Sequence, residues 1–212
     1  FAKHKHIRDN RIVTFIDKYK SNILLVLFGC IPIFIWLESF GLSNATANLG
    51  TSIASLGKAV ALCGTTLYCL NPILSARLRV LEKLYGGLDK LTRVHIASGK
   101  IAFWLIILHP VFLGLGRYLK DTPLSHIWDW SSLVIFLGIG AFFGLIIVTG
   151  MSIYAHVTHQ KWIWVHRFFG WLIPLFFLHG LLARGQITKI PLLFVFFGIL
   201  GIAGFVAFLY RS

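Results

Sequence analysis

Charge is what this sequence has little of, and acidic charge least of all. Charged side chains make up 13% of the 212 residues, whereas a soluble domain of this size carries about a quarter. Seven residues are Asp or Glu against twenty Lys and Arg, so we expect no paired catalytic carboxylates. With 57% hydrophobic residues and a mean hydropathy of +0.80, the composition is that of a membrane protein.

Cysteines and nucleotide-binding motifs are also scarce. The three cysteines, Cys30, Cys63 and Cys69, all fall inside apolar runs. An odd number without loop pairs argues against a disulfide framework, and we interpret them as small buried hydrophobes. No GxGxxG motif follows a predicted strand, and no phosphate loop is present. Because the chain begins at Phe1 rather than Met, we expect it to be part of something longer.

Six apolar runs are present, each long enough to cross about 30 Å of hydrocarbon at roughly 1.5 Å per residue. They lie near residues 22–40, 51–74, 94–118, 131–155, 164–183 and 189–210. Backbone groups without water must bond within their own segment, so these runs are predicted to be helices. The sequence therefore predicts an all-α, six-helix membrane bundle over residues 22–212. Residues 1–21 are predicted to form a basic amphipathic segment at the membrane surface.

Lys and Arg are distributed unevenly between the two sides of this bundle. One side carries the basic residues through Lys20, then Arg77, Arg79, Lys83, Lys90, Arg93, Lys161, Arg167 and Arg211, and the other carries Arg117, Lys120, Arg184 and Lys189. The positive-inside rule predicts that both termini are cytoplasmic, in a bacterial inner membrane or a plasma membrane. The net charge of +13 does not indicate nucleic-acid binding, because the basic residues lie in short flanks between apolar runs.

The connection over residues 75–93 has a helical pattern of its own. Leu78, Leu81, Leu84 and Tyr85 recur at helical spacing, and Gly86-Gly87 ends the pattern. We expect either a docking helix for a cytoplasmic partner or an interfacial helix without one.

Four histidines lie inside two of the predicted spans. His95 and His109 lie on the third span, and His166 and His179 on the fifth. On an ideal helix, fourteen steps return His109 to within roughly 40° of His95, about 21 Å further along. Thirteen steps place His179 about 19.5 Å beyond His166 but roughly 140° around the helix. We therefore expect a kink or local unwinding at Pro174 that brings both rings to one side.

Ionisable residues inside a membrane are costly and are functional by default. Four histidines at two matched depths on parallel helices predict two stacked haems. One haem would lie between His95 and His166, and the other between His109 and His179. Two axial histidines leave no open position on the iron, so such haems carry electrons and bind no substrate.

Three further residues are candidate haem contacts. Gly99 and Gly170 each lie one turn beyond a histidine, where a flat macrocycle needs a missing side chain, although helix packing in membranes also selects glycine. Lys58, inside the second span, is interpreted either as a partner of a haem propionate or as a side chain that reaches the outer interface.

The histidine pattern resembles the ferric reductase transmembrane domain shared by NADPH oxidases, metalloreductases and their bacterial relatives. The matching residues are His95 and His109, with thirteen residues between them, and His166 and His179, with twelve. The resemblance covers nearly the whole chain. It implies an oxidoreductase with two b-type haems that transfers electrons from cytoplasmic reduced flavin and NAD(P)H to oxygen or ferric iron outside. FAD and NAD(P)H would bind an adjoining domain or a partner subunit.

Other functions remain open at this stage. The chain also resembles the haem subunit of bacterial methionine sulfoxide reductase systems, which passes electrons from quinone or flavin to a periplasmic partner. A six-span transporter with a histidine proton relay, or a structural bundle, are alternatives from other classes. Arg184, five residues past His179, is a candidate catalytic residue that steers an anionic acceptor, or an ordinary flanking cation.

Overall fold

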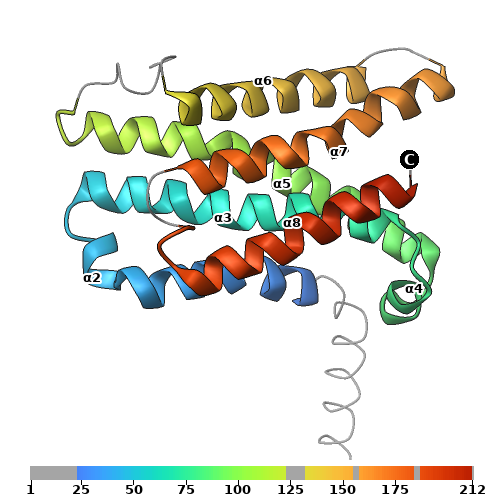
Figure 1. The fold of residues 1–212 in the computed structure, drawn as a ribbon, viewed down its shortest axis with the longest axis horizontal. Helices are drawn as coiled ribbons and strands as arrows, with labels where there is room; N and C mark the ends of the chain where they lie inside the picture. Colours follow the sequence, from blue (N-terminus) through green and yellow to red (C-terminus); the bar gives the residue numbers. More distant parts are fainter. Residues whose placement is uncertain (1–22, 123–131, 155–157, 184–186, 212) are drawn as a thin grey trace, which may run out of the picture.

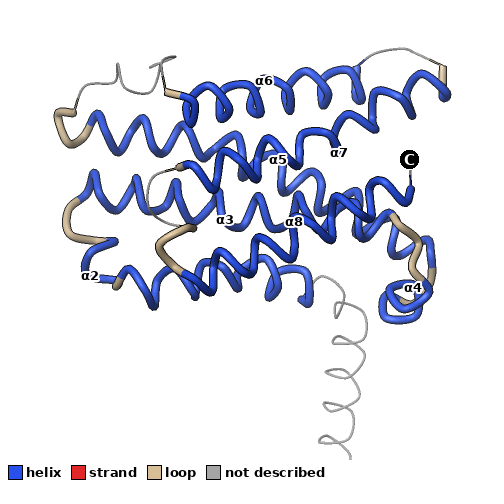
Figure 2. Tube along the Cα trace, in the orientation of Figure 1, coloured by secondary structure: helices blue, strands red, loops and turns tan. Residues whose placement is uncertain are grey.

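The computed structural model describes residues 23–122, 132–154, 158–183 and 187–211, and the regular elements within these ranges are all helices (Figure 1). Figure 2 shows the same ranges as helices joined by loops. The helices are Ile23–Phe40, α2 (Leu42–Ala45), α3 (Leu49–Ser75), α4 (Arg79–Tyr85), α5 (Leu88–Tyr118), α6 (Leu133–Tyr154), α7 (His159–Leu182) and α8 (Pro191–Arg211). Six of them are long and apolar enough to cross a membrane, which confirms the all-α, six-span prediction. The segment 1–21 lies outside the described residues.

The helix bounds follow the predicted spans, with two systematic extensions. α5 begins at Leu88 rather than near 94, and α7 begins at His159 rather than near 164. The added turns are polar, and a hydropathy pattern marks only the part of a helix that suits hydrocarbon. At 31 residues, α5 is about 46 Å long, so its ends extend beyond the apolar layer.

The connection before α5 folds as its pattern indicates. α4 ends at Tyr85; its cap residue, Gly86, adopts a left-handed conformation with φ 76°, and Gly87 follows with φ 118°. Glycine reaches positive φ without steric cost, so this pair turns the chain sharply from α4 into α5. Tyr85 packs in the core, where burial raises the pKa of its hydroxyl group. α4 therefore lies against the start of α5.

Four of the six membrane helices form two antiparallel pairs, and α8 packs on one helix of each pair. α3 packs along α5 over most of its length, and α6 packs along α7 (Figure 1). α8 packs on both α3 and α7, whereas α5 and α7 make almost no direct backbone approach. The two helices that carry the four histidines are thus held by different partners.

Glycines repeat every seven residues on the side of α3 that faces α5. They are Gly50, Gly57 and Gly64. A Cβ atom at Gly64 would lie 3.0 Å from Leu105 Cβ, and one at Gly50 would lie 2.9 Å from the Gly116 carbonyl oxygen. A seven-residue repeat keeps one seam facing a partner helix, and small residues let helix backbones approach closely in membranes. This seam fixes the register of α3 against α5.

The seam predicts that Gly116→Ala destabilises the fold. The new methyl group would lie 2.7 Å from the Gly50 carbonyl oxygen and 2.8 Å from the Ala54 amide nitrogen, and neither backbone atom can move freely. Overpacking of this kind costs about 1–3 kcal/mol. Gly198→Ala in α8 is the matched control, because nothing lies within 4 Å of its Cβ position. Thermal unfolding in detergent should show a lower midpoint for Gly116→Ala alone; equal midpoints would contradict the seam.

Candidate functional site

The four histidines form two pairs, one from each helix. The ring centres of His95 on α5 and His166 on α7 lie 6.2 Å apart, with an angle of 64° between the ring planes. His109 and His179 are close enough to interact electrostatically. The His95 and His166 rings therefore face each other towards the α4 end of the bundle, and His109 and His179 lie within electrostatic range of each other towards the α2 end.

Two of these rings are anchored on α3. His95 Nδ1 lies 3.1 Å from the Asn71 carbonyl oxygen, and His109 Nδ1 lies 2.9 Å from the Gly57 carbonyl oxygen. A carbonyl oxygen only accepts hydrogen bonds, so each Nδ1 carries the hydrogen and each Nε2 keeps a free lone pair. A neutral imidazole protonated at Nδ1 binds a metal through the lone pair on Nε2.

The third anchored ring belongs to His179 and rests on α6. Its Nδ1 donates to the Val134 carbonyl oxygen at 2.8 Å. The ring lies against Gly138, where a Cβ atom would stand 2.6 Å from His179 Cε1. Three of the four histidines thus present Nε2 as the free nitrogen. The fourth, His166, has a buried Nδ1 without a hydrogen-bond partner.

A second set of contacts supports His95 through Asn71. The Ser98 hydroxyl group donates to Asn71 Oδ1 at 2.8 Å. A Cβ atom at Gly99 would lie 2.7 Å from Asn71 Nδ2. Gly99 therefore makes room for the side chain of the residue whose carbonyl orients His95, and it acts on the pair indirectly.

The spacing of the 95/166 pair suits one metal ion between the rings. A metal held by two imidazole nitrogens at about 2 Å each separates the ring centres by about 6 Å, and the observed separation is 6.2 Å. Within the described ranges, no three His, Cys, Asp or Glu side chains gather into a metal-binding cluster. Two histidines per site fit a metal whose other ligands come from a macrocycle.

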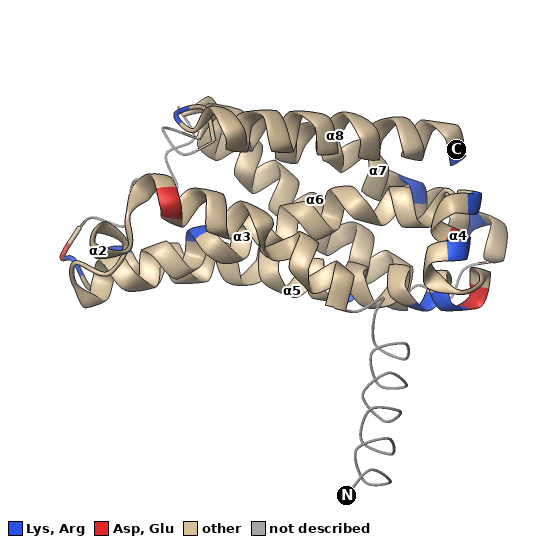
Figure 3. Ribbon diagram, turned by 90° about the horizontal axis from the view of Figure 1, so that it is seen from below, with Lys and Arg blue, Asp and Glu red and all other residues tan. Residues whose placement is uncertain are grey.

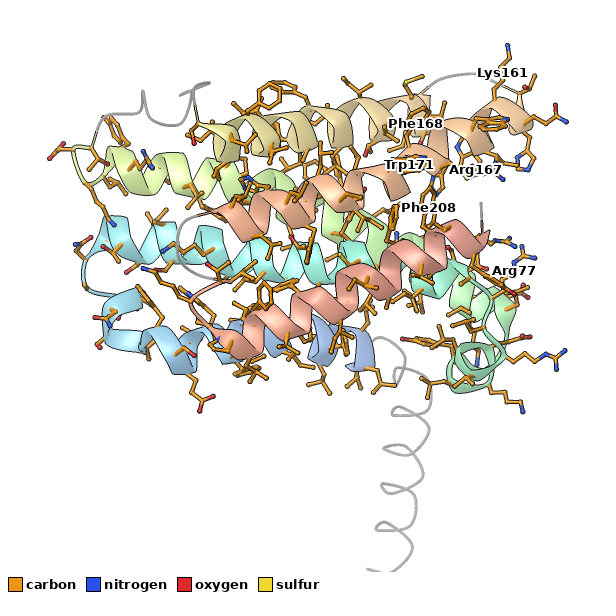
Figure 4. The ribbon with its side chains drawn as sticks, in the orientation of Figure 1. Arg77, Lys161, Arg167, Phe168, Trp171 and Phe208 are labelled. Atoms are coloured by element: carbon orange, nitrogen blue, oxygen red, sulfur yellow. The ribbon has the colours of Figure 1, made fainter. Side chains whose placement is uncertain are left out.

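Gly170 and Lys58 have neighbours of their own. Gly170 is covered by the Phe208 ring of α8, and Figure 4 shows Phe208 and Trp171 between the two ribbons. Lys58 Nζ lies 5.3 Å from the centre of the Phe40 ring, and Lys120 is close enough to act on it electrostatically. Arg184 lies outside the described residues.

α7 crosses Pro174 as one continuous helix. The local unwinding expected there is not found. His166 reaches His95 on α5, while His179 is anchored against α6 and still interacts with His109. The rings of one uninterrupted helix therefore meet partners on two different helices, α5 and α6.

Sequence reasoning missed the residues that orient the rings. They are Gly57, Asn71, Val134 and Gly138, with Trp162 beside His166. One signal was available: Gly57 and Asn71 are fourteen residues apart, as are His95 and His109. Because the two helices are antiparallel and the spacings are equal, the Asn71 carbonyl lies opposite His95 and the Gly57 carbonyl lies opposite His109.

Comparison with known protein families identifies a match. A family model described as "Ferric reductase like transmembrane component" matches residues 60–182, which is more than half of the chain and includes all four histidines. No curated protein matches the sequence.

The site predicts that Gly138→Ala disturbs the 109/179 pair. Its methyl group would lie 2.6 Å from His179 Cε1 and 2.8 Å from Nδ1, so the ring must move and lose its bond to Val134. Loss of such a supporting contact lowers metal affinity about 10–100-fold. Gly140→Ala is the control, since its Cβ would meet Leu175 at an ordinary 3.8 Å. The measurement is the amount of the haem predicted at this pair that each purified variant retains, and equal amounts in the two variants would rule out this role for Gly138.

Proposed function

The chain belongs to the family of ferric reductase like transmembrane components, and on that basis we propose that it holds two haem b groups and transfers electrons across a membrane. His95 and His166 hold one haem, and His109 and His179 hold the other. The observation that carries the proposal is the 6.2 Å spacing of the His95 and His166 rings. The rings come from two helices that otherwise hardly approach each other.

A haem with two axial histidines exchanges single electrons and offers no open iron position to a substrate. The protein supplies the orientation and basicity of the ligands. The carbonyl groups of Asn71, Gly57 and Val134 each accept a hydrogen bond from a histidine Nδ1. Such bonds fix the ring and make Nε2 a stronger donor, which favours the oxidised iron and lowers its potential.

The direction of transfer is proposed from the distribution of charge. In Figure 3, Lys and Arg gather at the α4 end of the bundle, with fewer at the α2 end. The described basic residues at the α4 end are Arg77, Arg79, Lys83, Lys90, Arg93, Lys161, Arg167 and Arg211. The positive-inside rule makes this end cytoplasmic. The 95/166 pair then receives electrons from reduced flavin and NAD(P)H on an adjoining domain or partner subunit.

The acceptor is oxygen or a ferric chelate on the outer side. Each electron moved outward alone works with or against the membrane potential, at about 2.3 kcal/mol per 100 mV. Arg184, five residues past His179, is proposed to steer an anionic acceptor. Lys58, half-buried beside Phe40 and near Lys120, is proposed to contact a propionate of the outer haem.

Proteoliposomes test this function with His109→Ala. A reductant on one side of the membrane should reduce a membrane-impermeant ferric chelate trapped on the other side when the wild-type protein is present. His109→Ala should lose this transfer but keep a reducible haem at the 95/166 pair, because only the outer ligand is removed. Leu108→Ala, at the exposed neighbouring position, should behave as wild type. Transfer at the wild-type rate through His109→Ala would refute the proposal.

A further inference from the structure

His166 is held differently from the other three histidines. Its Nδ1 is buried and makes no hydrogen bond, whereas His95, His109 and His179 each donate from Nδ1 to a backbone carbonyl. A metal-binding histidine almost always donates its second ring nitrogen to such a partner, which fixes the plane of the ring. Another contact must therefore set the orientation of His166.

Aromatic rings surround His166 on its own helix. Trp162 stacks on it with ring centres 4.7 Å apart and planes 18° apart. Phe169 meets it edge-on, at 5.1 Å and 69°. Positions three and four apart on a helix are neighbours. The imidazole of His166 therefore lies between the stacked indole ring of Trp162 and the phenyl ring of Phe169, which it meets edge-on.

Trp162 is itself fixed. Its indole nitrogen donates to the Ser152 carbonyl oxygen of α6 at 3.0 Å. On its other side, His159 stacks at 6.0 Å with planes 9° apart. His159 is the exposed first residue of α7. The three rings form a column along the first turns of α7, and its middle member is bonded to a second helix.

We propose that Trp162 is the positioning residue of His166, and that ring stacking replaces the hydrogen bond that orients the other three histidines. The inference rests on the proposed function, since it concerns how His166 is presented to a haem. Stacking restrains rotation of the imidazole but leaves its Nδ1 without a hydrogen bond. The 95/166 site therefore has one ligand whose hold depends on Trp162.

The test compares Trp162→Leu with Trp164→Leu in the purified, haem-loaded protein. Trp164 is two residues away and 65% exposed on the outside of the bundle, so it matches the size of the deletion without touching His166. The probe is carbon monoxide added to the reduced protein, because a haem with two firmly held histidines has no open position for it. Low-spin electron paramagnetic resonance signals of the oxidised protein report the ligand planes independently.

With Trp162→Leu, we expect one of the two haems to bind carbon monoxide, a shifted low-spin signal, and a loss of haem affinity of about 10-fold or more at that site. Trp164→Leu should match wild type. Trp162→Phe keeps a stacking ring without the indole N–H and should restore the wild-type signals. If Trp162→Leu does not fold, Trp162→Met, which fills more of the volume without a ring, takes its place with the same expected result.

If the wild-type protein holds two haems and the Trp162→Leu and Trp164→Leu proteins give the same signals, the inference is overturned but the proposed function is not. Failure of Trp162→Phe to restore the signals would overturn it as well, because the hydrogen bond to Ser152 would then be the effective contact. A wild-type protein without haem would instead overturn the proposed function, and the inference with it.

Discussion

The antiparallel register of α3 against α5 is the constraint on which the site depends. Gly50 meets Gly116 at one end of the seam, and the same register brings Gly57 to His109 and Asn71 to His95. Because the two acceptors and the two histidines are both fourteen residues apart, one alignment satisfies both hydrogen bonds. A one-residue slip would break both and leave two imidazoles unpaired, which is costly where no water is present.

In the second antiparallel helix pair, α6 and α7, the facing histidines, His166 and His179, come from α7. Neither helix of this pair packs closely on α5. The direct links of this pair to the α3–α5 pair are few. One is the Tyr68 hydroxyl group, which donates to the Phe169 carbonyl oxygen across α3 and α7 at 2.5 Å. α8 bridges the two pairs. A group bound by one histidine from α5 and one from α7 would therefore link the two helix pairs. Binding of such a group stabilises the folded state by mass action.

The spans, α4 and the pairing of His95 with His166 were predictable, because hydropathy, glycine turns and membrane histidines are local signals. The orienting contacts were not, since Val134, Gly138 and Trp162 matter only through the register of one helix on another. Gly170 shows the same limit: its spacing from His166 indicated a macrocycle contact, but the face it lies on packs against Phe208. Arg184 lies outside the described residues, so its role stays a prediction.

We propose that two iron porphyrins lie between α5 and α7, one at each histidine pair. A pyridine haemochrome assay on the purified protein, with protein quantified by amino-acid analysis, tests it most directly. We expect a value near two haem b per chain, with the reduced wild-type protein unreactive towards carbon monoxide as two-histidine ligation requires. A colourless protein, or one haem per chain, would contradict it.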